Sequence, residues 1–285
     1  MDRLIVVIAY LVALIAGLVA ISFFPESELW LKIAIGDFVA TVVIFLFSLI
    51  LKNSSMYDPY WSILPIFILL YILVMAGDTQ LSLRSIFVII IVGYWGIRLT
   101  MNWLRTWPGL GHEDWRYIKL AEDTGVFYWV VSFLGIHLFP TVLVYFGCLP
   151  LIPVVFSDQP FMWTDLAGLL VGIGAVEIER RADNQLRQFK VNGGAEKGSV
   201  CEVGLWKYSR HPNYFGEISF WGALFIMAYG LNPSENLIYG IGFLAMVILF
   251  VFITIPMMEK RQMSKNGYAE YRQRVWMLVP WFRKK

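Results

Sequence analysis

The sequence predicts an all-α, polytopic integral membrane protein. Hydrophobic residues make up 58% of the 285 residues and charged residues only 15%, and the mean hydropathy is +0.64. Several apolar runs approach the length of about 20 residues that a helix needs to cross a bilayer. This composition excludes a soluble globular domain. The formal net charge of +2 is too small to indicate a nucleic acid as a partner.

Eight apolar runs are candidate membrane-spanning helices, so we count seven or eight spans and prefer eight. The first run is interpreted as a retained helix, because it lacks the basic start and small-residue cleavage site of a signal peptide. The third run is short. The fifth is long and contains Pro140, Pro150 and Pro153, which should kink it or end it in a surface segment. The runs are 4–24, 31–51, 61–75, 86–104, 126–156, 161–178, 215–231 and 237–257.

The distribution of basic residues favours eight spans. The connections 25–30, 77–83, 157–159 and 232–236 contain no Lys or Arg, whereas basic residues populate 105–119, 180–210 and 260–285. With eight spans, all three basic segments lie on the same side of the membrane. Because Lys and Arg concentrate in cytoplasmic loops, both termini are expected in the cytoplasm.

The most informative segment, 204–217, reads Gly-Leu-Trp-Lys-Tyr-Ser-Arg-His-Pro-Asn-Tyr-Phe-Gly-Glu. Arg210 and His211 offer donors for a phosphate, and the amide of Asn213 can read a base or ribose edge. Pro212 fixes the backbone before a helix that is expected to begin near Tyr214. A single His at such a position could serve only interfacial hydrogen bonding. The density of polar residue types favours a binding site.

The sixth apolar run continues without Gly or Pro as far as Lys190, so its helix should extend beyond the membrane. Glu179, Asp183 and Arg187 are four residues apart and share one face. Two interpretations have equal weight: a solvated helix end with paired charges, or the wall of a pocket for an anionic cofactor. The two cysteines and three histidines have no metal-ligand spacing, so no metal site is expected.

These motifs resemble the steroid 5α-reductase C-terminal family, in particular its bacterial branch. The resemblance covers 55–285 and rests on the segment above, preceded by Ala-Asp-x-Gln-Leu and followed by Glu-Lys-Arg, Tyr-x-x-Tyr and Val-Pro-Trp-Phe. Arg-His-Pro-x-Tyr-x-Gly alone is similar to isoprenylcysteine carboxyl methyltransferases and phospholipid methyltransferases. Asp183, Asn213 and Glu217 favour the reductases.

The resemblance implies an NADPH-dependent reductase. Hydride transfer would reduce the C4=C5 double bond of 3-oxo-Δ4 steroids or similar apolar enones. It implies one domain, 1–285, whose helices enclose one cofactor and substrate cavity, with N-terminal helices at 1–51, substrate-side helices at 52–125 and NADPH-binding helices and tail at 126–285. The expected setting is a bacterial inner membrane, and the expected partners are a steroid-like small molecule and membrane lipid, with the protein a monomer.

The ketone would be polarised by an acid and a phenol. Asp58 is the expected acid, although an Asp before Pro is also a common N-cap. Tyr94 is the expected phenol, with Tyr60 as its alternative, because the family has Tyr-x-x-Arg where Tyr94 lies four residues before Arg98. The residues expected at the cofactor are Arg98, Asn102, Arg105, Glu179, Asp183, Arg187, Tyr208, Arg210, His211, Asn213, Tyr214, Glu217 and Arg261.

Two other function classes remain open. One is an S-adenosylmethionine-dependent membrane methyltransferase of the isoprenylcysteine carboxyl methyltransferase type, which shares the Arg-His-Pro element. The other is a membrane protein without enzymatic activity that binds or transports lipid.

Overall fold

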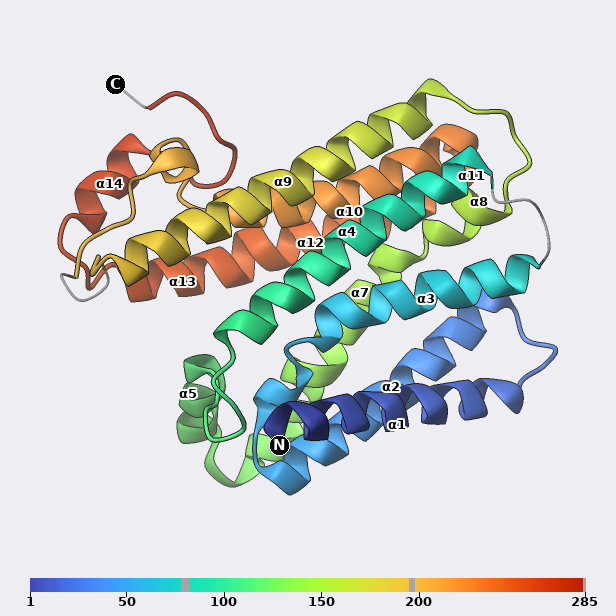
Figure 1. Ribbon diagram of the computed structural model, residues 1–285, viewed down its shortest axis with the longest axis horizontal. Coiled ribbons are helices and arrows are strands. Elements are labelled where there is room, and N and C mark those ends of the chain that lie inside the picture. Colours follow the sequence, from blue (N-terminus) through green and yellow to red (C-terminus); the bar gives the residue numbers. More distant parts are fainter. Residues whose placement is uncertain (78–81, 195–197, 284–285) are drawn as a thin grey trace. The chain divides into compact units, whose positions relative to one another are not determined.

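A computed structural model describes residues 1–77, 82–194 and 198–283. Their regular structure is entirely helical, and the only β-type pairing is an isolated bridge between Ser209 and Trp276 (Figure 1). The all-α prediction is therefore confirmed. Part of the connection 77–83 and the residues Lys197, Lys284 and Lys285, which entered the orientation argument, lie outside the described residues.

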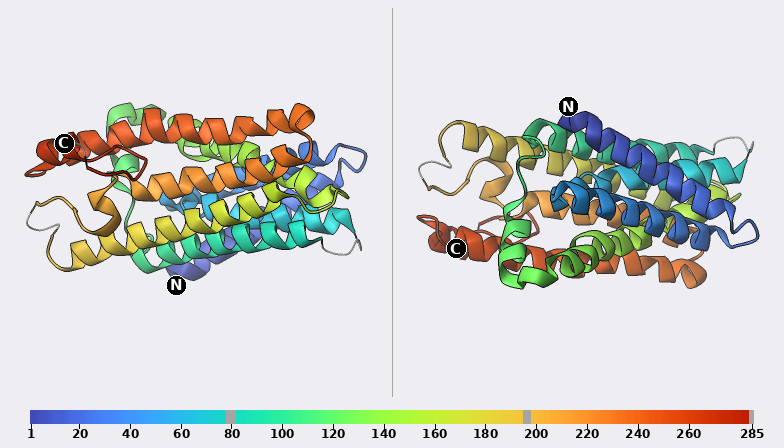
Figure 2. Two further views of the ribbon diagram at one scale, coloured as in Figure 1. Left: turned by 90° about the horizontal axis from the view of Figure 1, so that it is seen from above. Right: turned by 90° about the horizontal axis from the view of Figure 1, so that it is seen from below.

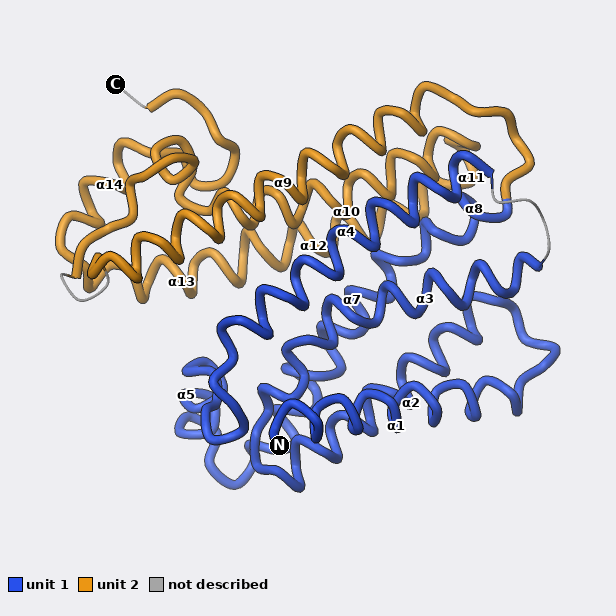
Figure 3. Tube along the Cα trace, in the orientation of Figure 1, with its two compact units in different colours: residues 1–156 blue, residues 157–285 orange. Residues whose placement is uncertain are grey.

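The chain divides into two compact units, Met1–Phe156 and Ser157–Lys285 (Figure 3). This boundary lies after the long fifth run, whereas the sequence placed its functional subdivision at 125/126. The prediction of one domain that encloses one cavity is not tested by this division and stays a prediction.

The first unit contains the first five apolar runs. Its α1 and α2 pack against each other (Figures 1 and 2), and a Cβ on Gly17 would lie 2.7 Å from the Gly36 carbonyl oxygen. Small residues are common where membrane helices approach closely. The elements are α1 (Asp2–Ser22), α2 (Leu29–Leu51), η1 (Ser54–Tyr57), α3 (Tyr60–Ala76), α4 (Leu83–Thr106), α5 (Trp115–Thr124), η2 (Gly125–Phe127), α6 (Tyr128–Val131), η3 (Ser132–Leu138), α7 (Phe139–Cys148) and α8 (Leu151–Phe156).

The fifth run is interrupted where its prolines predict. The segment η3 is π-helical and ends just before Pro140, which lacks the N–H that an α-helix needs at that point. A second break at Leu149 and Pro150 separates α7 from α8. The interruption carries His137 into the interior, where it is fully buried.

The second unit is built on α9 and α10, which pack along their length as an antiparallel pair. As predicted, α9 runs on past the apolar stretch and ends at Val191, and α10 begins at Pro212, two residues before the expected start. The elements are α9 (Trp163–Val191), η4 (Gly204–Lys207), α10 (Pro212–Leu231), α11 (Pro233–Asn236), η5 (Leu237–Tyr239), α12 (Gly240–Ile248), η6 (Leu249–Thr254), α13 (Ile255–Gln262) and α14 (Tyr268–Arg274).

Glycines set the distance between α9 and α10. A Cβ on Gly216 would lie 2.6 Å from the carbonyl oxygen of Ala175, and one on Gly230 would overlap the hydroxyl of Thr164. The two backbones therefore approach each other closely at both ends of α10. This close approach brings the polar start of α10 against the buried Glu179.

Within the described residues, six segments are long and apolar enough to cross a membrane: Asp2–Ser22, Leu29–Leu51, Ser54–Ala76, Leu83–Thr106, Trp115–Phe156 and Pro233–Gln262. They establish a polytopic membrane protein. Helices α9 and α10 contain 29 and 20 residues but are not among the six. Glu177 and Glu179 make α9 more polar, as Glu217 does for α10. The count of eight spans therefore stays a prediction.

Candidate active site

The turn that carries Asp58 is held by the loop before α5. Asn53 caps η1 by accepting from the amide of Ser55 at 2.9 Å, and its side-chain amide donates to the carbonyl oxygens of Leu110 and His112 at 2.8 and 3.0 Å. The Ser54 amide donates to Glu113 Oε1 at 2.7 Å. These hydrogen bonds hold the loop 110–113 against η1 and so position the start of α5.

Helix α5 places a phenol on Asp58. Asp114 caps the helix by accepting from the amide of Arg116 at 2.9 Å, and the same carboxylate forms an ion pair with the guanidinium of Arg116 at 2.7 Å. One residue further, the hydroxyl of Tyr117 donates to Asp58 Oδ1 at 2.7 Å. Asp58 and Tyr117 thus form an acid–phenol pair, which is the name used below.

The acid–phenol pair answers two questions that the sequence left open. Asp58 does not cap α3, because the N-cap position belongs to Pro59 and no side chain makes the capping bond. The phenol in contact with Asp58 is that of Tyr117, which the sequence analysis missed. The two residues are 59 positions apart. Asp114 before an amphipathic run predicts the start of α5, but no sequence pattern predicts where its third residue points.

The other two tyrosines lie elsewhere in the first unit. Tyr60 donates to Asp37 Oδ1 at 2.8 Å rather than to Asp58. Tyr94 lies in the middle of α4, with 36% of its surface exposed. On the same helix, Arg98, Asn102 and Arg105 follow at the spacing that places them on one face, as predicted. The catalytic role of Tyr60 or Tyr94 stays a prediction.

In the second unit, the C-terminal tail holds the polar segment 204–217. The hydroxyl of Tyr271 donates to the carbonyl oxygen of Trp206 at 2.7 Å, and the Ser209 hydroxyl donates to that of Leu278 at 2.6 Å. The Arg210 amide donates to the carbonyl oxygen of Trp276 at 2.8 Å. The Trp281 amide donates to the carbonyl oxygen of Tyr208 at 3.2 Å, so the Tyr-x-x-Tyr and Val-Pro-Trp-Phe motifs both position the segment that precedes α10.

The Arg210 side chain also bonds to the C-terminal tail. It is buried, its Nε donates to Glu259 Oε1 at 2.6 Å, and its Nη1 donates to the carbonyl oxygens of Arg272 and Val275 at 3.0 and 2.6 Å. Arg272 pairs with the other oxygen of Glu259 at 3.2 Å. These contacts hold the Arg210 side chain in place, and its role at the cofactor stays a prediction.

His211 lies beside the same carboxylate, with Nε2 at 3.5 Å from Glu259 Oε1. Its ring stacks on that of Tyr214 at 5.3 Å between centroids, and Tyr214 packs in turn on Phe250. Burial lowers the pKa of His211, although Glu259 opposes the shift by favouring the charged ring. His211 is thus a neutral ring at physiological pH, and it stiffens the start of α10.

Asn213 presents the clearest ligand-directed atom of the second unit. Its Oδ1 is buried and accepts no hydrogen bond from any described residue. A buried amide oxygen without a donor is costly, so such atoms are usually satisfied by water or by a ligand. A sugar hydroxyl or a carboxamide could supply the missing donor.

The remaining predicted residues lie on the same two helices and near the tail. Glu179 and Glu217 are buried, and Glu217 accepts from the indole nitrogen of Trp221 at 3.0 Å. Arg187 donates to Asn184 Oδ1 at 3.4 Å, which fits a solvated helix end. The other three are Asp183 on α9, Tyr208 after η4, which is exposed, and Arg261 on α13, which is also exposed.

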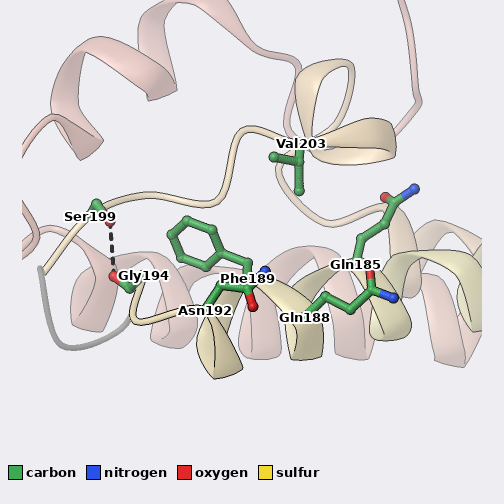
Figure 4. Close-up of a pocket in the computed structure, with 7 residues that line it drawn as sticks. All are labelled: Gln185, Gln188, Phe189, Asn192, Gly194, Ser199 and Val203. Atoms are coloured by element: carbon green, nitrogen blue, oxygen red, sulfur yellow. Dashed lines mark hydrogen bonds between the residues drawn. The ribbon is translucent and has the colours of Figure 1, made fainter.

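A pocket of about 430 Å³ lies at the end of α9 (Figure 4). Side-chain amides and the ring of Phe189 form much of its wall, and the Ser199 hydroxyl donates to the Gly194 carbonyl oxygen at 2.9 Å. None of the predicted cofactor residues lines it. Its lining residues are Gln185, Gln188, Phe189, Asn192, Gly194, Ser199 and Val203.

Curated relatives include proteins of two chemistries. An uncharacterized protein of Schizosaccharomyces pombe is 24% identical over 243 residues, which are 78% of this chain and 70% of that protein. The steroid 5-alpha-reductase DET2 of Gossypium hirsutum is 29% identical over 115 residues, 40% of this chain and 39% of the reductase. Methanethiol S-methyltransferase 1 of Bradyrhizobium diazoefficiens is 35% identical over 82 residues, 28% of this chain and 25% of that enzyme.

The chain therefore spans well under half the length of the two relatives that carry a named activity. No solved structure matches. The family described as "Protein of unknown function (DUF1295)" matches residues 44–275, which include the acid–phenol pair, the polar segment and most of the tail. The chain belongs to this family.

Proposed function

We propose that this protein is an NADPH-dependent reductase that saturates the C4=C5 double bond of 3-oxo-Δ4 steroids or similar apolar enones. The observation that carries the proposal is the acid–phenol pair, in which Tyr117 donates to Asp58 Oδ1 at 2.7 Å. The distant similarity to a steroid 5-alpha-reductase supports it. The resemblance of segment 204–217 to the reductase family supports the same reading.

The acid–phenol pair suits the activation of an enone. Negative charge develops on the ketone oxygen when the β-carbon accepts a hydride, and a hydrogen-bond donor aimed at that oxygen stabilises the charge. A carboxyl that keeps its proton, or a phenol, can serve as this donor. Tyr117 orients Asp58, and the guanidinium of Arg116 lies 5.4 Å from the centre of the Tyr117 ring. Asp58, Tyr94 and Tyr60 are the proposed catalytic residues, and we add Tyr117 as the residue that positions Asp58.

The cofactor is proposed to be NADPH, which supplies a hydride when bound. The buried and unsatisfied Oδ1 of Asn213 fits a cofactor that offers hydroxyl and carboxamide donors. The cationic side chains suit its phosphates. Arg210 supports the segment through Glu259. The residues proposed to hold NADPH are Arg98, Asn102, Arg105, Glu179, Asp183, Arg187, Tyr208, Arg210, His211, Asn213, Tyr214, Glu217 and Arg261.

The test is an assay of NADPH oxidation by the purified protein with a 4-ene-3-one steroid, followed by identification of the product. Asp58→Asn should lower turnover by roughly 10²–10⁴-fold, the usual contribution of a general acid, with little change in NADPH affinity. Tyr117→Phe should lower turnover less, because it removes only the group that orients Asp58. Asn213→Ala should instead weaken NADPH binding.

Tyr128→Phe is the matched control, because Tyr128 also bonds to η1 through the Ser54 hydroxyl at 2.7 Å. An equal loss of turnover in Tyr128→Phe and Tyr117→Phe would assign the effect to the fold of the turn. No NADPH consumption with any 4-ene-3-one would favour a lipid-binding or transport protein without enzymatic activity.

A second candidate is an S-adenosylmethionine-dependent methyltransferase, favoured by the similarity to the methanethiol S-methyltransferase. The Arg-His-Pro element occurs in both classes, so it does not discriminate between them. Titration of the purified protein with NADPH and with S-adenosylmethionine decides the matter. Saturable binding of S-adenosylmethionine, with none of NADPH, would replace the reductase by this alternative.

A further inference from the structure

A carboxyl group lies in the interior of the first unit, away from the acid–phenol pair. Asp37 is only 4% exposed and belongs to α2, a candidate membrane-spanning segment. Its Oδ1 accepts from the Tyr60 hydroxyl at 2.8 Å, and its Oδ2 is buried without a hydrogen-bond partner. An ionisable side chain within a membrane span is costly and is usually retained for function.

No described cation balances Asp37. The titratable groups that interact with it electrostatically are Tyr57 on η1, Tyr60 on α3, and Tyr145 and Cys148 on α7. Nearby, α1 contributes Tyr10, whose ring packs on that of Tyr60, and η3 contributes His137, whose ring packs on that of Tyr57. The four groups that act on Asp37 are neutral at physiological pH. A permanent carboxylate would therefore be an isolated buried charge.

A chain of four hydroxyl groups ends on Asp37. Beyond the bond from Tyr60, the Thr41 hydroxyl donates to the Tyr60 oxygen at 3.2 Å. Thr41 and Thr141 share a bond of 2.8 Å, as do Thr141 and Tyr57. In one arrangement, Tyr57 donates to Thr141 and Thr141 donates to Thr41. Thr41 then donates to Tyr60 and Tyr60 donates to Asp37, so every hydrogen bond of the chain points toward the carboxyl. That arrangement gives a carboxylate at Asp37 one hydrogen-bond donor, at Oδ1.

The same chain also satisfies the protonated acid. The Thr141 hydroxyl has a second acceptor, the His137 carbonyl oxygen at 2.8 Å, and the Tyr60 hydroxyl has the Asp37 carbonyl oxygen at 3.1 Å. If Asp37 Oδ1 carries a proton and donates to the Tyr60 oxygen, the Tyr60 hydroxyl can donate to the Asp37 carbonyl oxygen. Thr41 can then donate to Thr141, and Thr141 to the His137 carbonyl oxygen. Neither state leaves one of these hydroxyl groups without an acceptor.

We propose that Asp37 is a proton-binding site in the membrane-spanning part of the first unit, with the hydroxyl groups of Tyr60, Thr41 and Thr141 as the chain that reverses when the proton binds, while Tyr57 donates to Thr141 in both states. One O–H bond forms at Asp37 on loading and breaks on release, and the other oxygens only exchange hydrogen-bond partners. The ligand is a proton, because a lone carboxyl with no second acidic or histidine ligand is not a metal site among the described residues. The proposal does not depend on the reductase activity.

Infrared spectroscopy tests the proposal on the full-length protein in detergent or nanodiscs. The carboxylic acid C=O band is measured across the pH range in which the protein stays folded, and the band of Asp37 is the part lost in Asp37→Asn. We expect that band to decrease reversibly as the pH rises. It should shift in D₂O, and it should shift again in Tyr60→Phe, which removes the hydrogen-bond partner of Oδ1. Asp158→Asn, at an exposed position, is the control variant and should leave the band assigned to Asp37 unchanged.

Two results would overturn the proposal. One is the absence of an Asp37 acid band at every pH, which would mean a permanent carboxylate. The other is a band of constant intensity, which would mean a permanently neutral acid that only holds α2 and α3 together. If Asp37→Asn does not fold, the same titration on Tyr60→Phe decides, since a titrating band that fails to shift in that variant also contradicts the proposal.

Discussion

Arg210 and Glu259 form a buried ion pair that holds the polar segment 204–217 to α13. The two side chains are only 7% and 9% exposed and lie 2.6 Å apart. Removing one partner from a buried ion pair leaves the other charge uncompensated, which is far more costly than losing a surface pair.

The substitution Glu259→Gln is therefore expected to destabilise the protein by about 3–5 kcal/mol. Thermal unfolding of the detergent-solubilised protein measures the change. Glu202→Gln is the control, because Glu202 pairs with the exposed Arg274 and Arg283, and loss of such surface pairs costs at most about 1 kcal/mol. Equal effects of the two substitutions would contradict a buried, structural pair.

His211 predicts a pH dependence of stability. Burial lowers its pKa below the ordinary value of 6.5, and the charge of Arg210 lowers it further, whereas Glu259 opposes the shift only partly. At His211, the unfolded chain thus binds a proton at a higher pH than the folded chain. The stability that the neutral His211 contributes is therefore complete above pH 6.5 and is lost as the pH falls below it.

In the measurement, the unfolding temperature should fall as the pH is lowered from 6.5, and the fall should be shallower in His211→Gln. His112→Gln, at an exposed histidine, should keep the slope of the parent protein. A slope that His211→Gln leaves unchanged would show that other groups cause the pH dependence.

At the scale of elements, the packing of α9 on α10 depends on glycine. A Cβ at Gly216 would lie 2.6 Å from a backbone oxygen of α9, so the helices would have to separate. The sequence predicts both helices and the continuation of α9 beyond the membrane, because an uninterrupted run without Gly or Pro is a local property. It did not predict that Glu179 would be buried against Gly216, which depends on how the two helices meet.

Gly216→Ala is expected to destabilise the protein by roughly 1–3 kcal/mol, the usual cost of overpacking. Gly174→Ala is the matched control on α9, where an added Cβ meets no atom within 4 Å. There, alanine should be neutral or stabilise the helix by up to about 1 kcal/mol. If both substitutions had the same effect on thermal unfolding, the close approach at Gly216 would not limit stability.

At the scale of the whole molecule, six apolar segments establish a membrane protein, and α9 and α10 decide the topology. If both span, the connection between them lies in the cytoplasm with the termini, as the distribution of basic residues predicts. If neither spans, that connection lies on the other side of the membrane, together with the connection 157–159.

Cysteine labelling in intact cells separates these topologies, with the buried Cys148 and Cys201 replaced by serine. A cysteine at Gln188 should react with a membrane-impermeant maleimide only after permeabilisation, whereas one at Asp158 should react directly. Labelling of both positions from outside would contradict the eight-span arrangement and the cytoplasmic cofactor site.

The sequence by itself determined the helical membrane fold, the interruption of the fifth run near Pro140 and the concentration of polar groups at 204–217. These are properties of composition, proline geometry and short-range pattern. Only the tertiary structure decided that Asp58 meets Tyr117, that Tyr60 serves Asp37, and that Arg210 is held by Glu259. Each of these contacts joins residues well separated along the chain, and the packing that joins them leaves no periodic trace in the sequence.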